Sequence, residues 1–146
     1  MVKTLLGVFL PLSCYCMDET QCLAQNIYFE ARGESLTGQL AVAYTTLNRV
    51  VSDRFPDTVC EVVWQPRQFS WTHDGKSDAP KQTKLELKAW EQSNLLSSFV
   101  IHAWPILKFF DPTKGSTYYH SKQVMPFWSY HYEPSVVIGE HIFYTE

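Results

Sequence analysis

The chain has 146 residues, the length of one ordinary domain rather than two. Hydrophobic residues make up 45% and charged residues 18%, values that exclude an intrinsically disordered chain. Twelve Lys and Arg against fifteen Asp and Glu give a net charge of −3 without a long basic run, which excludes a nucleic-acid-binding protein that depends on phosphate contacts. Five Trp, eight Tyr and nine Phe suit either a packed core or a platform for flat ligands such as sugar rings.

The first 18 residues have the character of a separate segment. Lys3 precedes an apolar run at residues 5–10, the pattern of a secretory signal or anchor, and the run is too short to span a bilayer. An Ala-x-Ala cleavage site is missing, so the alternative is a buried first element of the domain. We expect a possible signal or anchor segment at 1–18, a domain at 19–146 and no stable membrane span.

The middle of the chain has helical periodicity. Residues 19–33 and 83–99 repeat apolar side chains at helical spacing, and residues 39–52 do so after Ser35 or Thr37 as the N-cap. One or two further helical turns are expected at Val59–Val63, and residues 65–81 read as a long loop or short hairpin.

The last third of the chain has a different pattern. Beyond Trp104 and Pro105, Pro and Gly divide it into short pieces, and segments 117–120, 136–138 and 142–144 read as strands, the last two joined at 139–140. Helices followed by a small antiparallel sheet predict an α+β fold.

Four cysteines lie at positions 14, 16, 22 and 60. The spacing of Cys14 and Cys16 fits neither a zinc knuckle nor a redox pair. Cys22 and Cys60 could form a disulfide in an exported protein, or could both be small buried apolar residues.

The helix expected to end at Gly33 carries a carboxylate, Glu30, at the edge of its apolar face. Burial disfavours the charged form of a carboxyl group and raises its pKa, as a general acid requires. The alternative is a structural ion pair with Arg32 or Arg49.

Several segments, in order along the chain, resemble the SleB/CwlJ cell-wall hydrolase family. They are Ala24–Ala43, which contains Glu-Ala-Arg-Gly-Glu from Glu30 to Glu34, then 47–50, 55–60, 68–71, 74–75, 115–120, 126–128 and 138–143. Relatives often carry cysteines where this chain has Arg67 and His73, so a second disulfide is not expected. The resemblance implies a lysozyme-like α+β fold, with a helical N-terminal part followed by a small antiparallel β-sheet.

The resemblance also implies an activity and its catalytic residue. The family cleaves peptidoglycan between N-acetylmuramic acid and N-acetylglucosamine, as a lytic transglycosylase, and its catalytic glutamate falls on Glu30. A transglycosylase uses the muramyl C6 hydroxyl as nucleophile, so one Glu can act first as acid and then as base. Ordinary glycosidases need two carboxylates, and Glu34 is a less favoured second one, as are Asp74 and Glu133.

The remaining motif residues are candidate substrate contacts, with core packing as the alternative for each. Hydrogen-bonding groups and flat rings suit acetamido groups, hydroxyls and sugar faces. The candidates are Glu34, Gln68, Ser70, Trp71, Tyr118, Tyr119, His120 and Trp128, with Tyr118 or Tyr119 expected to affect the rate most.

The five histidines lack the close pairing of zinc ligands, so we expect no metal and no cofactor. The predicted protein is a monomer that acts on peptidoglycan glycan strands outside the cytoplasm, in the periplasm or cell wall, or after delivery as a lysis enzyme (endolysin). A water-using muramidase and a non-catalytic glycan-binding protein are the alternatives.

Overall fold

The computed structural model describes residues 17–146. The predicted signal or anchor segment therefore lies almost wholly outside the described residues, as do Cys14 and Cys16. None of the helices in the described part is long and apolar enough to cross a membrane.

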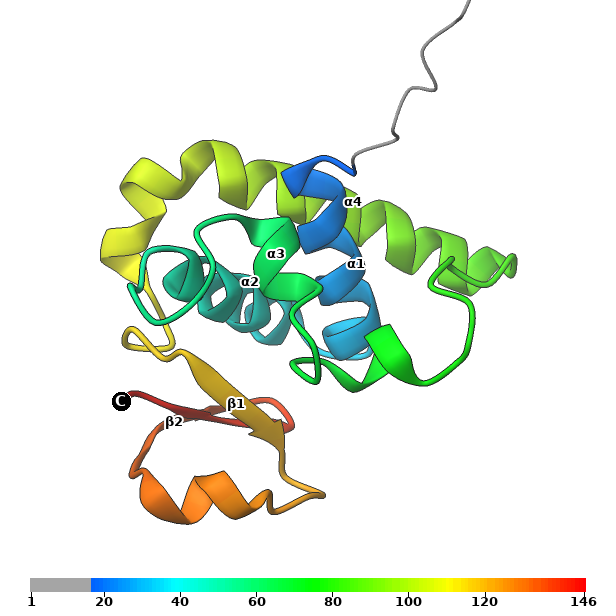
Figure 1. Ribbon diagram of the computed structural model, residues 1–146. Helices are drawn as coiled ribbons and strands as arrows, with labels where there is room; N and C mark the ends of the chain where they lie inside the picture. The colour runs from blue at the N-terminus through cyan, green and yellow to red at the C-terminus, as the bar shows by residue number, and fades with distance from the viewer. Residues whose placement is uncertain (1–16) are drawn as a thin grey trace, which may run out of the picture.

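Four α-helices form the upper body of the molecule in Figure 1, and each begins at a polar cap. They are α1 (Glu19–Ala31), α2 (Leu36–Val50), α3 (Val59–Val63) and α4 (Lys84–Leu107), with short 3₁₀ turns at Ser70–His73 (η1) and Lys108–Phe110 (η2). The side chains of Asp18, Ser35, Thr58 and Thr83 accept backbone N–H bonds of the first turns, which satisfies donors that a helix start leaves free.

Helix α4 is longer than the sequence indicated, because it passes through Pro105 and ends at Leu107. Proline inside a helix removes one hydrogen bond and normally ends or bends it. Here the end of α4 is held from α2, since the Tyr44 hydroxyl donates to the Leu107 carbonyl (2.9 Å) and the Tyr44 ring meets Trp104 edge to face at 5.4 Å. These contacts offset the cost of the proline.

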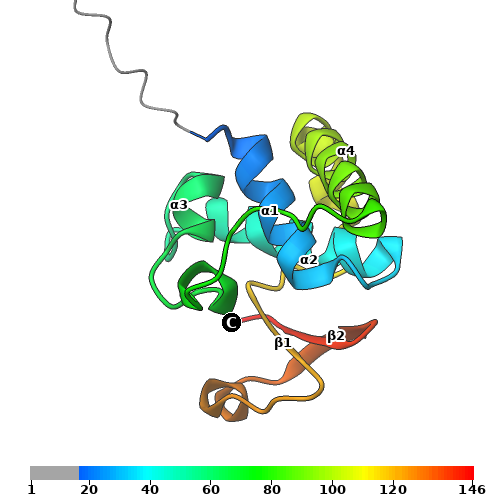
Figure 2. The ribbon, with the colours of Figure 1, turned by 90° about the vertical axis from the view of Figure 1, so that its right-hand side faces the viewer.

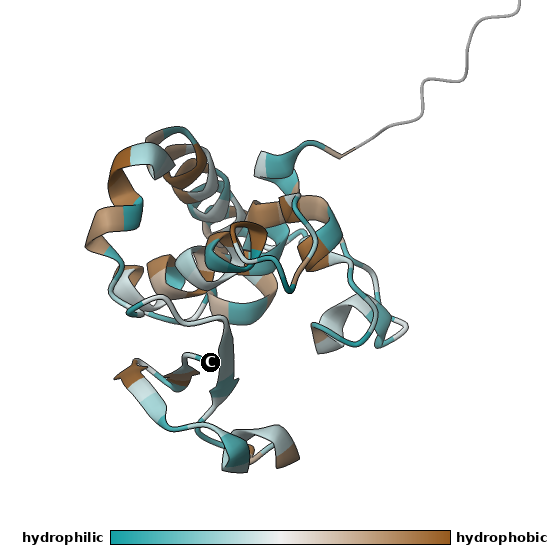
Figure 3. Cartoon of the chain, turned by 60° about the vertical axis from the view of Figure 1, so that its left-hand side comes forward, coloured by the Kyte–Doolittle hydropathy of each residue, from teal (hydrophilic) through white to brown (hydrophobic). Residues whose placement is uncertain are grey.

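The core lies where α1 packs against its neighbours. Leu23 and Ile27 of α1 and Val100 of α4 are fully buried, and Ser97 on α4 is small enough for the helices to approach closely. The Ser97 hydroxyl donates to the Thr20 carbonyl (2.5 Å). Figure 3 shows the hydrophobic residues mostly along the helices.

A three-stranded antiparallel sheet lies below the helices in both Figure 1 and Figure 2. Its strands are β1 (Tyr118–Ser121), β2 (Pro134–Ile138) and β3 (His141–Tyr144), in the order β1-β3-β2, and the turn between β2 and β3 is the expected pair 139–140. A 3₁₀ helix, η3 (Phe127–His131), which the sequence did not predict, lies between β1 and β2. The predicted α+β arrangement, a helical part followed by a small antiparallel sheet, is confirmed.

The two faces of the sheet have different neighbours. Tyr119 pairs with Phe143, and both side chains belong to the face that meets the helices, where Phe143 is fully buried. On the opposite face, Trp128 of η3 packs edge to face against His120 and Tyr144, at 5.6 and 5.4 Å between ring centroids. The sheet thus presents Tyr119 to the helical body.

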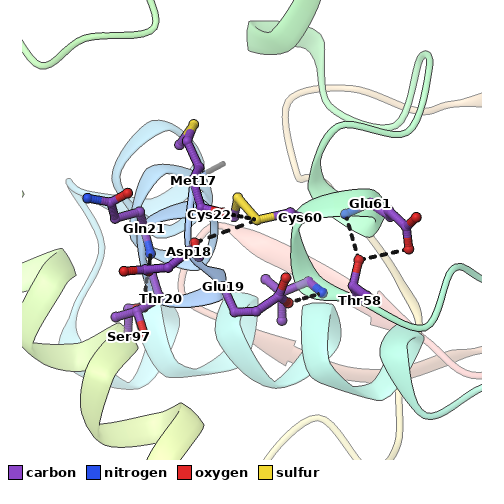
Figure 4. The surroundings of a disulfide bond; sticks show 11 residues. Met17, Asp18, Glu19, Thr20, Gln21, Cys22, Thr58, Cys60, Glu61 and Ser97 are labelled. Atoms are coloured by element: carbon purple, nitrogen blue, oxygen red, sulfur yellow. Dashed lines mark hydrogen bonds between the residues drawn. A yellow bond between two sulfur atoms is a disulfide. The ribbon is translucent and has the colours of Figure 1, made fainter. Parts of the chain in front are cut away.

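Cys22 and Cys60 form a disulfide that joins the start of α1 to α3, with Cα atoms 5.2 Å apart (Figure 4). Of the two alternatives left open by the sequence, the structure therefore has the bonded one.

Removing this disulfide should lower stability. The bond closes a segment with a sequence separation of 38, and a loop of that length is expected to contribute about 3–4 kcal/mol. The chain with both cysteines replaced by serine should therefore unfold at lower urea concentration than wild type. Reduction should lower the wild-type midpoint and leave the double variant unchanged; an unaltered wild-type midpoint after reduction would contradict this account.

Candidate functional site

Glu30 lies in the last turn of α1 and points at the sheet. Its Oε2 accepts a hydrogen bond from the Tyr119 hydroxyl of β1 (3.0 Å), across 89 positions of sequence. Both residues line a cleft of about 350 Å³, which is bounded by the ends of α1 and α2, by the segment 67–73, and by β1 with the segment that follows it. Burial raises the pKa of Glu30, while the Tyr119 hydrogen bond and the charge of Arg49 lower it. The carboxyl group is thus shifted toward the protonated form that a general acid needs at neutral pH.

Tyr119 remains a hydrogen-bond donor over a wide pH range. Burial, assisted by the negative charge of Glu30, raises the pKa of its hydroxyl well above the usual value. Its ring is fixed by edge-to-face contact with His141 (5.3 Å) and a tilted contact with Phe143 (5.5 Å). A protonated phenol that binds one carboxyl oxygen leaves the other oxygen of Glu30 free to face a ligand.

Arg49 is a buried cation at the cleft, with only 2% of its surface exposed. The sequence analysis considered it only as an ion-pair partner of Glu30. Its Nε donates to the Thr117 carbonyl (2.6 Å), and Nη1 and Nη2 donate to the side-chain oxygen of Gln68 (2.9 and 3.0 Å) in the amide orientation that satisfies both residues. The guanidinium also lies over the rings of Phe55 and Phe69, each at 5.3 Å. The apolar pattern of α2 gave no signal for it, because Arg49 shares a helix face with Thr45 and Thr46, opposite the apolar stripe, and that face is buried as well.

Most of the predicted contact residues meet at the cleft. Those that line it with Glu30 are Gln68, Ser70, Tyr119, His120 and Trp128. Arg67 and His73 line it as well, and Arg67 adopts a left-handed backbone conformation (φ 64°). The cleft therefore combines one carboxyl group, several polar donors and the ring of Trp128, a combination suited to a polar ring-shaped ligand.

Three predicted contacts lie elsewhere. Trp71 is 6% exposed and stacks on Phe29 within the core, at 4.7 Å between ring centroids. Tyr118 is on the opposite face of β1 from Tyr119 and stacks on Tyr132 (5.5 Å). Glu34 faces the β2–β3 turn, where it accepts hydrogen bonds from the Glu140 backbone N–H.

Glu30 forms no ion pair within 4 Å among residues 17–146. Arg32 pairs instead with Glu86 (3.0 Å), and Arg49 is engaged as described above. The structural ion-pair alternative for Glu30 is therefore not supported. Of the other carboxylates considered from the sequence, Asp74 pairs with Lys76 (3.4 Å), and neither it nor Glu133 lines the cleft.

The comparisons with known proteins identify the family. Residues 33–144 match the family model described as Cell Wall Hydrolase. The chain belongs to the Cell Wall Hydrolase family. The match begins after Glu30, so it covers the sheet, Tyr119 and most of the cleft, but not the carboxyl group itself.

Relatives of known identity agree. The chain is 33% identical over 130 residues to a spore cortex-lytic enzyme of Bacillus cereus, covering 88% of this chain and 45% of that enzyme, so it spans less than half the length of this relative. It is similar to the catalytic domain of Bacillus cereus SleB, with a TM-score of 0.62 and 31% identity, over 91% of this chain and 94% of that one.

A second solved structure is the catalytic domain of the germination-specific lytic transglycosylase SleB from Bacillus anthracis. It matches with a TM-score of 0.66 and 31% identity, over 91% of this chain and 98% of that one. The SleB/CwlJ resemblance carried by the motifs is confirmed, and the chain is an enzyme domain of the cell-wall hydrolase type.

Replacing Tyr119 by phenylalanine should raise the pKa of Glu30. The ring remains to exclude water, but the hydrogen bond that favours the ionised carboxyl is lost. Carbon-13 NMR titration of side-chain-labelled glutamate would measure the change. Tyr130→Phe, at a tyrosine that is 72% exposed, is the matched control and should leave Glu30 unchanged. A lowered or unaltered Glu30 pKa in Tyr119→Phe would contradict the assignment.

Proposed function

We propose that this domain is a lytic transglycosylase, which cleaves the β-1,4 bond between N-acetylmuramic acid and N-acetylglucosamine in peptidoglycan. The observation that carries the proposal is the Glu30 carboxyl group, which is half-buried at the cleft wall and bound through one oxygen to Tyr119. The similarity to the catalytic domain of a germination-specific lytic transglycosylase from Bacillus anthracis supports the same reaction class.

The proposed mechanism uses Glu30 twice. The protonated carboxyl group first donates its proton to the glycosidic oxygen, so the bond to the muramyl anomeric carbon breaks with the negative charge of the leaving oxygen neutralised. The resulting carboxylate then removes the proton from the muramyl C6 hydroxyl, whose oxygen bonds to the anomeric carbon and closes a 1,6-anhydro ring. The nucleophile belongs to the substrate, so the two reacting groups are already held together.

Neighbouring groups assist each protonation state of Glu30. Burial favours the protonated acid of the first step, whereas the Tyr119 hydrogen bond and the Arg49 charge stabilise the carboxylate of the second. Glu30 is the one carboxylate among the cleft-lining residues of the described chain, which is the arrangement that a one-acid mechanism requires.

The sugars are proposed to bind along the cleft. Gln68 has its carbonyl oxygen engaged by Arg49, which leaves its amide N–H groups for a substrate oxygen. Ser70 and His120 add polar groups, and Trp128 adds a ring face. Peptidoglycan is the proposed partner and action outside the cytoplasm the proposed location.

Product analysis tests the proposal. Wild-type protein incubated with purified peptidoglycan should release fragments ending in 1,6-anhydromuramic acid, identified by mass spectrometry. Glu30→Gln should lower their rate of release by about 10²–10⁴-fold, the usual contribution of a general acid–base group. The exposed Glu133→Gln should match wild type and serves as control.

Each alternative has its own outcome. Reducing muramic ends would indicate a water-using muramidase, and no soluble product from folded wild-type protein would indicate a glycan-binding protein. Anhydro products that persist in Glu30→Gln would show that another group is the acid. Any of these results would overturn the proposal.

A further inference from the structure

Glu34, the second glutamate of the Glu-Ala-Arg-Gly-Glu motif, occupies a slot between the helices and the sheet. A Cβ atom on Gly38 of α2 would come within 2.8 Å of the Glu34 Cβ, and a Cβ atom on Gly139 of the β2–β3 turn would overlap Glu34 Oε2. Gly139 also adopts a left-handed backbone conformation (φ 57°) that favours glycine. Two glycines from opposite sides thus make the room that this carboxylate fills.

The backbone of Glu34 is fixed on the helical side of the slot. Its N–H donates to the Ala31 carbonyl at the end of α1 (2.9 Å), and its carbonyl accepts from Gln39 Nε2 of α2 (3.0 Å). Gln39 is itself only 3% exposed. The side chain therefore projects from a rigid junction between the helix that carries Glu30 and the helix that follows.

On the sheet side of the slot, the Glu34 carboxylate binds the β2–β3 turn. The Glu140 N–H donates to both of its oxygens, at 3.2 and 3.3 Å, and His141 Nδ1 lies 3.7 Å from Oε1. Burial and His120 lower the pKa of His141, while Glu34 and Glu140 raise it, so the ring is biased toward the neutral form. A carboxylate that accepts a backbone N–H makes a charge-assisted bond, roughly twice as strong as a neutral one.

His141 links Glu34 to Tyr119, because it lies beside both side chains. The two rings meet edge to face at 5.3 Å, and Tyr119 in turn donates to Glu30. We infer that Glu34 is a positioning residue, which anchors the β2–β3 turn to the helical body and thereby holds Tyr119 on Glu30. The inference rests on the proposed catalytic role of Glu30, and it gives Glu34 a task that needs no contact with substrate.

A double-mutant cycle between Glu34 and Tyr119 tests this. Glu34→Ala should lower kcat by roughly 10–100-fold with KM changed less than about twofold, the scale of loss that a displacement of about 1 Å causes. In the Tyr119→Phe background the same substitution should cost less than about threefold, because residues acting through one contact are not additive. Glu91→Gln, an exposed carboxylate on α4, is the matched control.

The pH dependence of kcat separates positioning from mere stability. Glu34→Ala should shift the apparent pKa that the pH profile of kcat assigns to Glu30. In the Tyr119→Phe background the same substitution should cause no further shift of that pKa. Three results would each overturn the inference. They are losses of kcat that multiply in the double variant, an effect on KM alone, and an unchanged apparent pKa of Glu30 in the pH profile.

Glu34→Gln distinguishes a positioning role of Glu34 from a role in acid–base catalysis. It also provides a second variant in case the alanine variant does not fold. The amide has the same shape and keeps an oxygen for the Glu140 N–H, so it should retain activity within about fivefold of wild type, as a group removed from the chemistry would. A loss as large as that of Glu30→Gln would instead make Glu34 a catalytic carboxylate and overturn the inference.

Amide hydrogen exchange gives a readout that needs no activity. Exchange at Glu140 should accelerate in Glu34→Ala and remain close to wild type in Glu34→Gln and Glu91→Gln. It reports on the anchor whether or not Glu30 is the acid, so failure of the proposed function and failure of this inference are distinguished. Unchanged exchange at Glu140 in Glu34→Ala would overturn it.

Discussion

The hydrogen bond from Tyr119 to Glu30 is the contact on which the rest of the site depends. A carboxyl group placed in a partly dry cleft is costly to ionise, and a second group must hold it in one orientation if it is to transfer a proton. The protein supplies that group from a strand 89 positions further along the chain. The site therefore exists only when the sheet is docked correctly on the helices.

Several features of the fold serve this docking. The disulfide and the α1–α4 packing fix the helix that carries Glu30, while Phe143, buried beside Tyr119, fixes the inner face of the sheet. Arg49 ties the end of α2 to the Thr117 carbonyl just before β1 and to Gln68 at the cleft. A buried guanidinium with its donors paired and aromatic rings around it is tolerated where an unpaired cation would not be.

Sequence alone predicted what depends on local pattern. The Ser35 cap of α2 followed from the sequence, as did the β2–β3 turn from its Gly-Glu pair. Glu30 stood out because a carboxylate at the edge of an apolar face has few roles. The continuation of α4 through Pro105 and the burial of Trp71 depend on tertiary contacts that have no local signature. The direction of Glu34 could not be predicted either, since it depends on space left by a glycine more than 100 positions away.

The most direct test of the account is a crystal structure of the Glu30→Gln variant with a glycan tetrasaccharide of alternating N-acetylglucosamine and N-acetylmuramic acid. In that complex the scissile oxygen and the muramyl C6 hydroxyl should both lie within hydrogen-bonding reach of the residue-30 side chain, about 2.6–3.2 Å, with the Tyr119 hydroxyl still bound to it. Sugars bound away from this cleft, or a C6 hydroxyl turned away with a water molecule placed for attack, would contradict it.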